Sequence, residues 1–404
     1  MANTLPPLSL YIHTPWCVRK CPYCDFNSHE PSPYEPSPYE PGSHGFTPRD
    51  LPEEAYLKAL LQDLDGDLAL AAGREIQTIF IGGGTPSLLS PVFYQRLLRE
   101  IKARLPIADD AEITLEANPG TTEQERFIGY RNAGINRLSL GIQSFQPDQL
   151  HALGRIHSGN EAVAAVQQAR QAGFTNINID LMHGLPGQTP QLAMDDIEQA
   201  LVLAPEHLSW YQLTLEPNTA FHSSPPTLPE EEALWDIQDK GHQRLEQAGF
   251  ERYEISAYAT AHHQSRHNLN YWQFGDYLGI GAGAHGKLSH IDQNGQWCIE
   301  RRWKTRQPDA YLKRFNDLRG FIAGKQLLTS DELPLEFAMN ALRLTQGVTL
   351  DTWSANTGQS DVMLLERLQT ADKKGLLMQM PEKLRASPQG LLFLNELLAL
   401  ICDD

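Results

Sequence analysis

The sequence predicts an α/β protein in which parallel strands form a partial barrel, followed by a mainly helical C-terminal domain. Three observations support this. Apolar, β-branched runs alternate with amphipathic stretches, polar residues close several of these runs, and the pattern changes to successive helices after about residue 300. Strand and helix pairs in a row require a parallel sheet, either a partial barrel or an open doubly wound sheet.

Each expected strand is a run of branched or aromatic residues that ends at glycine, proline or a polar side chain. In chain order these runs are LSLYIH (8–13), TIFIGGG (78–84), ITLEANP (113–119), RLSLGIQSF (137–145), NINIDLMHG (176–184) and HLSWYQLTLEP (207–217). The intervening stretches, rich in Ala, Leu and Gln, have the apolar spacing of amphipathic helices. These helices are expected at 53–72, 90–104, 122–133, 160–172, 191–203 and, after the last strand, 230–248.

Polar residues at strand ends favour the barrel over the open sheet. Glu116, Gln143 and Asp180 each close an apolar strand and precede a loop. Any one of them alone reads equally well as a helix cap or a turn residue. Together they would converge at the mouth of a barrel, where such folds place their sites.

The C-terminal segment has a different organisation. Helices are expected at 333–345 and 361–375, followed by a short hairpin and a closing helix at 390–402. This order resembles a winged-helix module, but the segment is not strongly basic, so we expect it to pack on the barrel or bind protein.

The expected division of the chain has three parts. The barrel spans 1–250 and includes a proline-rich insertion at 31–45, which carries a tandem PSPYE repeat and forbids a helix. A barrel extension follows at 251–325, and the winged-helix-like domain occupies 326–404.

Composition and charge exclude several classes of function. The formal net charge is −17, from 50 Asp and Glu against 33 Lys and Arg, so nucleic acid and anionic membrane surfaces would be repelled. The N-terminus lacks the basic and apolar regions of a secretion signal, and no apolar run is long enough to span a bilayer. These features predict a cytoplasmic protein.

Three of the five cysteines, Cys17, Cys21 and Cys24, lie in the segment WCVRKCPYCDF. In a reducing compartment this cluster reads as a metal site. A structural zinc site needs four ligands, and His13 or His29 would have to complete it. A four-iron cluster held by three cysteines instead leaves one iron open to chelate an amino and a carboxylate group, such as the methionine end of S-adenosylmethionine (SAM).

The Cys-x3-Cys-x2-Cys spacing, with an aromatic residue before the last cysteine and GGGTP (82–86) after the second strand, resembles the radical SAM superfamily. The segments YIHTPWC, LEANP, GIQSF, LGRIH, NIDLMHGLPGQT and HNLNYW resemble the coproporphyrinogen dehydrogenase subfamily, and within it the HemW-type heme chaperones. The dehydrogenases have a further cysteine where this chain has Phe26, and a longer N-terminal extension.

The resemblance implies metal ligation by the three cysteines and a set of cofactor contacts. The residues implied to contact SAM or a second SAM-like ligand are Tyr11, Tyr23, Gly83, Gly84, Thr85, Glu116, Gln143, Arg155 and Asp180. Arg155 could pair a ligand carboxylate or be a plain surface residue, and Asp180 could instead stabilise the following turn. Glycines 82–84 could admit ligand backbone contacts or only form a tight turn.

The stretch RHNLNYW (266–272) resembles the HNxxYW motif of the heme-chaperone group. His267 could ligate heme iron and Arg266 could meet a propionate, although a His, Tyr and Trp group is often core packing. His13, His157, His183 and His285 are weaker candidates. The nearby GAGAHG (281–286) matches a dinucleotide fingerprint only formally, and in this context it is expected to let backbone approach SAM.

The resemblance therefore implies a heme-trafficking chaperone with a [4Fe-4S] cluster, SAM and heme as cofactors. Its partners would be heme and heme-accepting respiratory proteins, membrane-bound ones included, and the sequence leaves a homodimer open. Two alternatives stand beside it: an oxygen-independent coproporphyrinogen III dehydrogenase and a non-catalytic zinc-stabilised barrel. Whether SAM is cleaved, and so whether the protein is an enzyme, is left open by the sequence.

Overall fold

The computed structural model describes residues 4–30, 51–120, 126–378 and 382–402. The PSPYE repeat and the expected insertion at 31–45 lie outside the described residues. No helix in the described part of the chain combines the length and the apolar character that crossing a bilayer requires.

In the described residues, twelve strands form one mixed sheet in the order β12-β11-β10-β9-β1-β2-β3-β4-β5-β6-β8-β7. The first six strands pair in parallel, and β9 returns parallel to β1 on its other side. The remaining pairs are antiparallel. The strands are β1 (Leu8–Thr14), β2 (Ile76–Gly83), β3 (Ile107–Ala117), β4 (Arg137–Gln143), β5 (Ile177–His183), β6 (His207–Gln212), β7 (Glu251–Glu254), β8 (Ala257–Ala259), β9 (Asp276–Ile280), β10 (His285–Ile291), β11 (Trp297–Lys304) and β12 (Ile322–Leu327).

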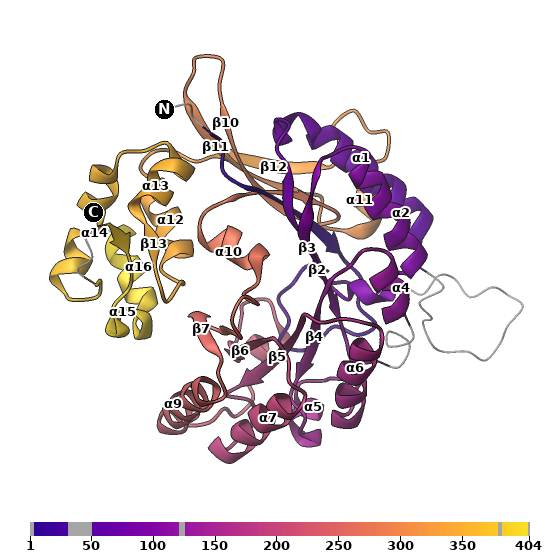
Figure 1. Cartoon of the computed structure of the whole chain (residues 1–404), viewed down its shortest axis with the longest axis vertical. Helices are drawn as coiled ribbons and strands as arrows, with labels where there is room; N and C mark the ends of the chain where they lie inside the picture. The colour runs from indigo at the N-terminus through magenta and orange to yellow at the C-terminus, as the bar shows by residue number, and fades with distance from the viewer. Residues whose placement is uncertain (1–3, 31–50, 121–125, 379–381, 403–404) are drawn as a thin grey trace, which may run out of the picture.

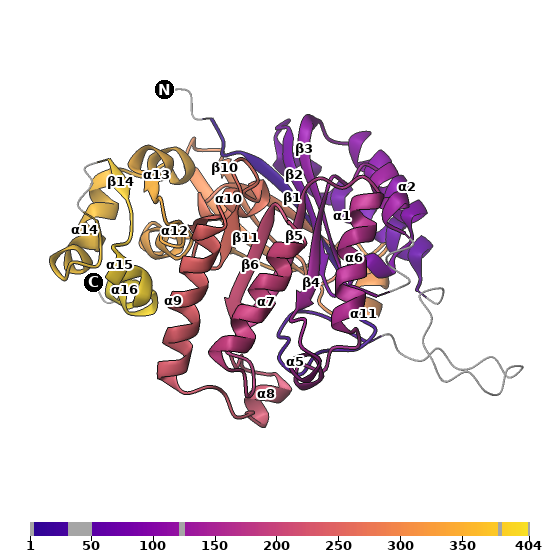
Figure 2. The ribbon, with the colours of Figure 1, turned by 60° about the horizontal axis from the view of Figure 1, so that its bottom comes forward.

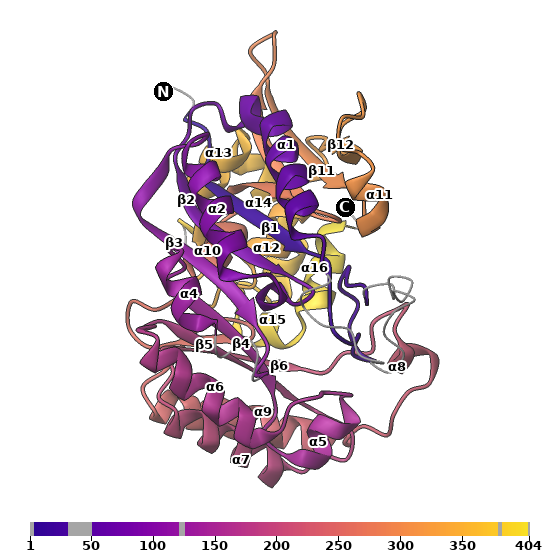
Figure 3. The ribbon, with the colours of Figure 1, turned by 90° about the vertical axis from the view of Figure 1, so that its right-hand side faces the viewer.

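The helices of the barrel lie on the outer side of this sheet, as Figures 1 and 2 show for α1, α6, α7 and α9. In Figure 3, α1 and α2 lie in front of β1 and β2. These helices and the short ones between them are α1 (Glu53–Ala71), the 3-10 helix η2 (Pro86–Leu88), α2 (Pro91–Lys102), α4 (Phe127–Asn132), α5 (Pro147–Ala152), α6 (Gly159–Gln171), α7 (Pro190–Val202), α8 (Ala220–Ser223), α9 (Glu231–Gln247), α10 (Arg266–Trp272) and α11 (Pro308–Leu312).

The two faces of the sheet differ in chemistry. Alternate residues such as Leu10, Ile79 and Leu138 are fully buried in the main core, together with apolar side chains of the outer helices. The other set, which we call the inner face, carries polar groups such as Glu116 and Asp180. Successive side chains of a strand point to opposite faces of the sheet. The same alternation along each strand therefore places apolar residues on the outer face and polar residues on the inner face. The helices that connect the parallel strands lie on the outer face, which identifies the partial barrel rather than the doubly wound alternative, so the predicted fold class is confirmed.

Residues 251–325 extend the sheet at both ends and add α10. Figure 1 shows α10 inside the curve of the sheet, and it contacts β1, β2, β9 and α12 (Leu333–Ala341). The sequence pattern did not indicate strands β9–β12. Their buried positions include charged residues, so apolar alternation is weak.

The charged residues of the extension pair beneath α1. Lys304 of β11 is 2% exposed and binds the carboxylates of Asp63 and Asp67, at 2.6 Å for Asp67. Arg302 reaches Asp67 at 2.9 Å, and the Tyr311 hydroxyl donates to Asp63 at 2.7 Å. This buried network fixes the extension to the first barrel helix.

The C-terminal part forms a second core that includes Phe274 and Ile299 of the extension. The expected helices at 333–345 and 361–375 correspond to α12 and α14 (Asp361–Lys373). The expected hairpin is seen as an antiparallel bridge between Leu377 and Ala386, with its turn outside the described residues. The closing helix is divided into α15 (Pro388–Leu392) and α16 (Leu394–Cys402), and the sequence analysis missed α13 (Leu350–Thr357) and the pair β13 (Val348–Thr349) and β14 (Lys383–Leu384).

We expect Lys304→Met to lower the free energy of unfolding by about 3–5 kcal/mol, because the buried Asp63 would lose its cationic partner and Asp67 would keep only Arg302. Urea unfolding followed by circular dichroism measures this change. Lys240→Met is the matched control, since Lys240 pairs with Asp236 on an exposed helix surface and should change stability by less than about 1 kcal/mol. Equal effects of the two substitutions would contradict the assigned role of the network.

Candidate functional site

The three clustered cysteines follow β1 as free, half-buried thiols. Each has a polar neighbour: Thr85 Oγ1 donates to Cys17 Sγ at 3.4 Å, an Arg155 N–H donates to Cys21 Sγ at 3.7 Å, and Ser28 Oγ lies 3.9 Å from Cys24 Sγ. Burial raises the pKa of Cys17 to about 11 and also raises the pKa of Cys24, so ligation must displace their protons. Three soft sulfur donors surrounded by hydrogen-bonding groups fit an iron-sulfur cluster.

The histidines that the zinc alternative would need have other partners. His13 Nε2 donates to the Asn27 carbonyl at 2.9 Å and its Nδ1 accepts from the Tyr11 hydroxyl at 2.8 Å, while His29 Nε2 donates to Asn27 Oδ1 at 3.1 Å. Burial is the main cause that lowers the pKa of His13 to about 4. In the described residues, no three His, Cys, Asp or Glu side chains are arranged to hold one metal ion.

Asn27 fastens the cysteine loop to the barrel extension. Its Nδ2 donates to the carbonyls of Ala282 and Arg306 at 3.0 and 2.9 Å. The approach is so close that a Cβ on Gly283 would lie 2.1 Å from Asn27 Nδ2. Gly283 of GAGAHG is therefore explained by packing of the turn between β9 and β10 against the cysteine loop, whereas a Cβ on Gly281 would meet the His13 carbonyl at 2.4 Å.

The glycine-rich end of β2 packs against the same loop. Gly83 has a φ of +113°, and a Cβ there would meet the His13 ring at 2.6 Å. A Cβ on Gly84 would lie 2.5 Å from the Trp16 carbonyl. The tight-turn reading thus has a firm basis, and the same absence of side chains leaves backbone open to a ligand.

Two carboxyl groups lie together on the inner face. Glu116 Oε2 accepts from the Gly83 N–H at 3.1 Å, and Asp180 accepts from Asn178 Nδ2 at 2.7 Å and Ser139 Oγ at 3.0 Å. Burial, followed by the charge of Asp180, raises the pKa of Glu116 to about 8. Burial also raises the pKa of Asp180. Carboxyls at these positions can accept hydrogen bonds from ribose hydroxyls or donate one when protonated.

Arg155 connects the cysteine loop to β4. Besides Cys21, its guanidinium binds Asn118 Oδ1 at 2.7 Å and the Gly141 carbonyl at 2.5 Å. It is half-buried, which does not fit the plain surface reading. Gln143 closes β4 with a φ of +70° and accepts from the Tyr211 hydroxyl at 2.8 Å.

The aromatic candidates lie at different places. Tyr11 is half-buried on the inner face and stacks on Phe80, with ring centroids 6.4 Å apart. Tyr23 packs beside Phe221 in a small separate cluster with Leu153. The expected convergence concerned Glu116, Gln143 and Asp180. Glu116 and Asp180 lie close enough for their charges to interact, and the hydroxyl that donates to Gln143 belongs to Tyr211, which feels both carboxyls.

His267 lies deeper, on α10 and against the inner face. It is 1% exposed, its ring stacks on Phe80 at 5.1 Å, and Tyr271 meets its edge at 4.9 Å. Thr78 Oγ1 donates to Ser9 Oγ and therefore accepts from His267 Nδ1–H at 2.7 Å. This fixes the tautomer and leaves the lone pair on Nε2, which has no hydrogen-bond partner. Burial, followed by the charge of Arg137, lowers the pKa of His267 to about 3, so the ring is neutral at pH 7.

The remaining heme candidates are less suited. His157 Nε2 donates to the Ile142 carbonyl at 3.1 Å, and His285 is exposed beside Trp303. His183 packs on Trp210 and its Nδ1 also has no partner, but among the described residues no hydrogen bond orients its ring as Thr78 orients His267. Arg266 points to the surface, where it binds Asp110.

Sequence reasoning missed Arg137, a buried cation on the inner face. Its position in RLSLGIQSF, in phase with the inner-face residue Ser139, was the available signal.

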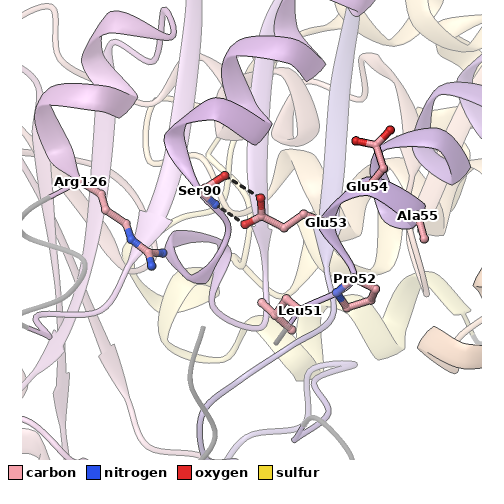
Figure 4. A pocket seen from close by; sticks show the side chains of 7 residues that line it. All are labelled: Leu51, Pro52, Glu53, Glu54, Ala55, Ser90 and Arg126. Carbon is pink, nitrogen blue, oxygen red and sulfur yellow. Dashed lines mark hydrogen bonds between the residues drawn. The ribbon is translucent and has the colours of Figure 1, made fainter. Parts of the chain in front are cut away.

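A surface pocket of about 610 Å³ lies apart from the cysteines in sequence, at the start of α1 (Figure 4). Glu53 there accepts from Ser90 N and Oγ, both at 2.6 Å, and Arg126 donates to the carbonyls of Ser87 and Leu88. These bonds hold the corner between α1 and α2, and they occupy the polar groups that a ligand would use.

Comparison with known proteins agrees with this geometry. The radical SAM superfamily matches residues 11–200, and the HemN C-terminal domain matches residues 328–393. The heme chaperone HemW of Escherichia coli strain K12 is 49% identical over 98% of both chains, and that of Haemophilus influenzae is 48% identical over 99% of both. The chain belongs to the HemW family of radical SAM proteins.

A solved structure of the Escherichia coli coproporphyrinogen III oxidase HemN, described as a radical SAM enzyme, shares the fold. It matches 99% of this chain and 91% of its own with a TM-score of 0.78, at 22% sequence identity. This likeness supports the fold, while the HemW relatives, aligned over 98% and 99% of the chain, confirm the family resemblance drawn from the motifs.

We expect Glu116→Gln to flatten the pH dependence of stability in the ligand-free protein. A folded-state pKa of about 8, above the ordinary value, means that folding binds a proton, so this group's contribution falls as pH rises toward 8. The variant should gain stability relative to the parent between pH of about 5.5 and about 8.5, as urea midpoints would measure. Glu251→Gln, at an exposed strand end, should follow the parent, and parallel curves for all three proteins would contradict the assignment.

Proposed function

We propose that the protein binds heme and transfers it to heme-accepting respiratory proteins, with a [4Fe-4S] cluster and SAM as resident cofactors. The observation that carries the proposal is His267: a neutral imidazole, oriented by Thr78, whose Nε2 lone pair is free. A histidine held this way by an outer hydrogen bond is suited to ligate iron. The chain belongs to the HemW family, whose relatives are named heme chaperones, and this supports heme as the iron-containing ligand of His267.

The cover over His267 sets a condition on this binding. The rings of Phe80 and Tyr271 contact the imidazole, and the residue is 1% exposed. Heme binding therefore requires α10 or these rings to move, and the moved aromatic side chains would then be available to stack on the macrocycle.

Cys17, Cys21 and Cys24 would hold the cluster, with Asn27 keeping their loop against the extension. A cluster with an open iron, once reduced, supplies an electron to a bound SAM sulfonium. Around it, the contacts implied for Tyr11, Tyr23, Gly83, Gly84, Thr85, Glu116, Gln143, Arg155 and Asp180 would bind and orient SAM. Glu116, with its raised pKa, can hold a proton at its carboxyl oxygen near neutral pH.

The three segments suggest a division of labour. The barrel at 1–250 would carry the cluster and SAM, the extension at 251–325 would carry His267, and the domain at 326–404 would contact protein partners. Five free cysteines suit a reducing compartment such as the cytoplasm. The fold shared with HemN is compatible with coproporphyrinogen dehydrogenation, but at 22% identity it supports the fold alone.

We expect the anaerobically reconstituted protein to bind about one hemin per chain, seen as saturation of the Soret band, and His267→Ala to weaken binding by at least about tenfold. His151→Ala, on an exposed surface of α5, is the control and should bind like the parent. Undiminished affinity in His267→Ala would remove this ligand. Absence of hemin binding, together with loss of carbon dioxide from coproporphyrinogen in the presence of SAM, would favour the dehydrogenase.

We expect Cys21→Ala to abolish the iron and acid-labile sulfide retained after reconstitution, because two thiolates cannot hold a cluster with one open corner. Cys298→Ala is the matched control: Cys298 lies on β11 opposite His290, in the extension, and its loss should leave the iron content unchanged. Zinc retained in place of iron would contradict the cluster.

A further inference from the structure

Arg137 is a buried cation that forms no direct ion pair among the described residues. Four cationic side chains are buried in the part of the chain that the structure describes. Lys287 pairs with Asp276 at 2.8 Å, and Lys304 and Arg302 share Asp67. Arg137 is 2% exposed, yet its Nε has no hydrogen-bond partner, and among the described residues no carboxylate lies within 4.0 Å of its guanidinium.

No carboxylate forms an ion pair with Arg137 among the described residues. The carboxyl of Asp180 does feel its charge, which opposes the rise in the pKa of Asp180 that burial causes. The charge of Arg137 is also felt by His267, His207 and Tyr253, and burial keeps both histidines neutral by lowering their pKa values. The carboxylate of Glu112 accepts from the backbone N–H groups of Arg266 and His267, both at 3.1 Å, and so caps α10.

Two neighbours of Arg137 have unused hydrogen-bonding capacity. Thr114 lies opposite Arg137 in the register between β3 and β4, is 0% exposed, and its Oγ1 has no partner. His267 Nε2 is also without a partner. A guanidinium cannot give up its proton, so a buried one without a directly bound anion is unfavourable until an anion joins it.

We propose that Arg137 binds a carboxylate of the tetrapyrrole cargo, with Thr114 Oγ1 donating a second hydrogen bond to it. This inference rests on the proposed heme binding, and it assigns the heme propionate as the anion. Guanidinium and carboxylate match in a two-bond geometry, which suits the recognition of a propionate beside the iron ligand His267.

The carboxylate of SAM is the competing source, and the position of Arg137 argues against it. Arg155, which contacts Cys21, binds the Gly141 carbonyl. Arg137 lies four residues before Gly141 on β4, which is about 13 Å along an extended strand. Arg137 therefore lies toward the amino end of β4, far from the carboxyl end at which the cysteine loop would hold SAM.

The test compares hemin with hemin dimethyl ester, in which both propionates are masked, on the reconstituted full-length protein. The parent should bind hemin about 10- to 100-fold more tightly than the ester, and Arg137→Gln should lose that preference while binding the ester and SAM as the parent does. Arg319→Gln, on an exposed side chain paired with Asp317, should match the parent throughout.

Stability separates a ligand contact from a structural role. Arg137→Gln should unfold at an equal or higher urea concentration than the parent without ligand, because it removes an unpaired buried charge. Arg302→Gln, which removes one of the two cations that bind the buried Asp67, should unfold at a lower one. A loss of stability in Arg137→Gln as large as that in Arg302→Gln would overturn the inference.

Other outcomes are equally decisive. If the parent protein bound hemin and its dimethyl ester with equal affinity, the proposed propionate contact would be overturned before any variant was made. The proposed heme binding would still stand. Weaker SAM binding in Arg137→Gln with unchanged hemin affinity would assign the carboxylate to SAM. A parent that binds neither hemin nor the ester would refute the proposed function, and this inference with it.

Discussion

The two-sided character of the curved sheet is the constraint on which the rest of the structure depends. Residues such as Leu10, Ile79 and Leu138 must be buried under the outer helices, and this burial drives folding. The alternate residues are then forced onto the inner face, whatever their chemistry. A site rich in buried polar groups can therefore be maintained, because the outer core supplies the stability.

The barrel extension is held to the first barrel helix and to the cysteine loop by two sets of contacts. The buried network of Lys304, Asp63 and Asp67 fixes β11 beneath α1. Asn27 and Gly283 then join the same extension to the cysteine loop. As a result, the segment that carries His267 and the segment that carries the cysteines are held in one frame, although some 240 residues separate them in the sequence.

The inner face is graded from one end to the other. Thiols, Arg155 and Glu116 lie near the carboxyl ends of the strands, and neutral His267 lies with the unpaired Arg137 toward the other end. Groups that are neutral by burial and a cation without a partner are unfavourable in an empty protein and favourable when a ligand is present. This arrangement agrees with the proposal of two chemically distinct ligands on the inner face. The cofactor would lie near the carboxyl ends of the strands, and the heme would lie nearer their amino ends.

The sequence by itself determined the strand and helix alternation, the polar strand ends and the three-cysteine loop, because these depend on local periodicity and spacing. It did not reveal β9–β12, because charged residues at their buried positions hide the apolar alternation. Nor did it show that Arg137 forms no ion pair among the described residues, because ion pairs join residues that are far apart in the sequence. It named His267, but only the tertiary structure decided its tautomer, by placing Thr78 and Ser9 beside Nδ1. The physical reason is that the groups packed around a side chain in space set its protonation state and decide which of its hydrogen-bonding atoms remain without a partner.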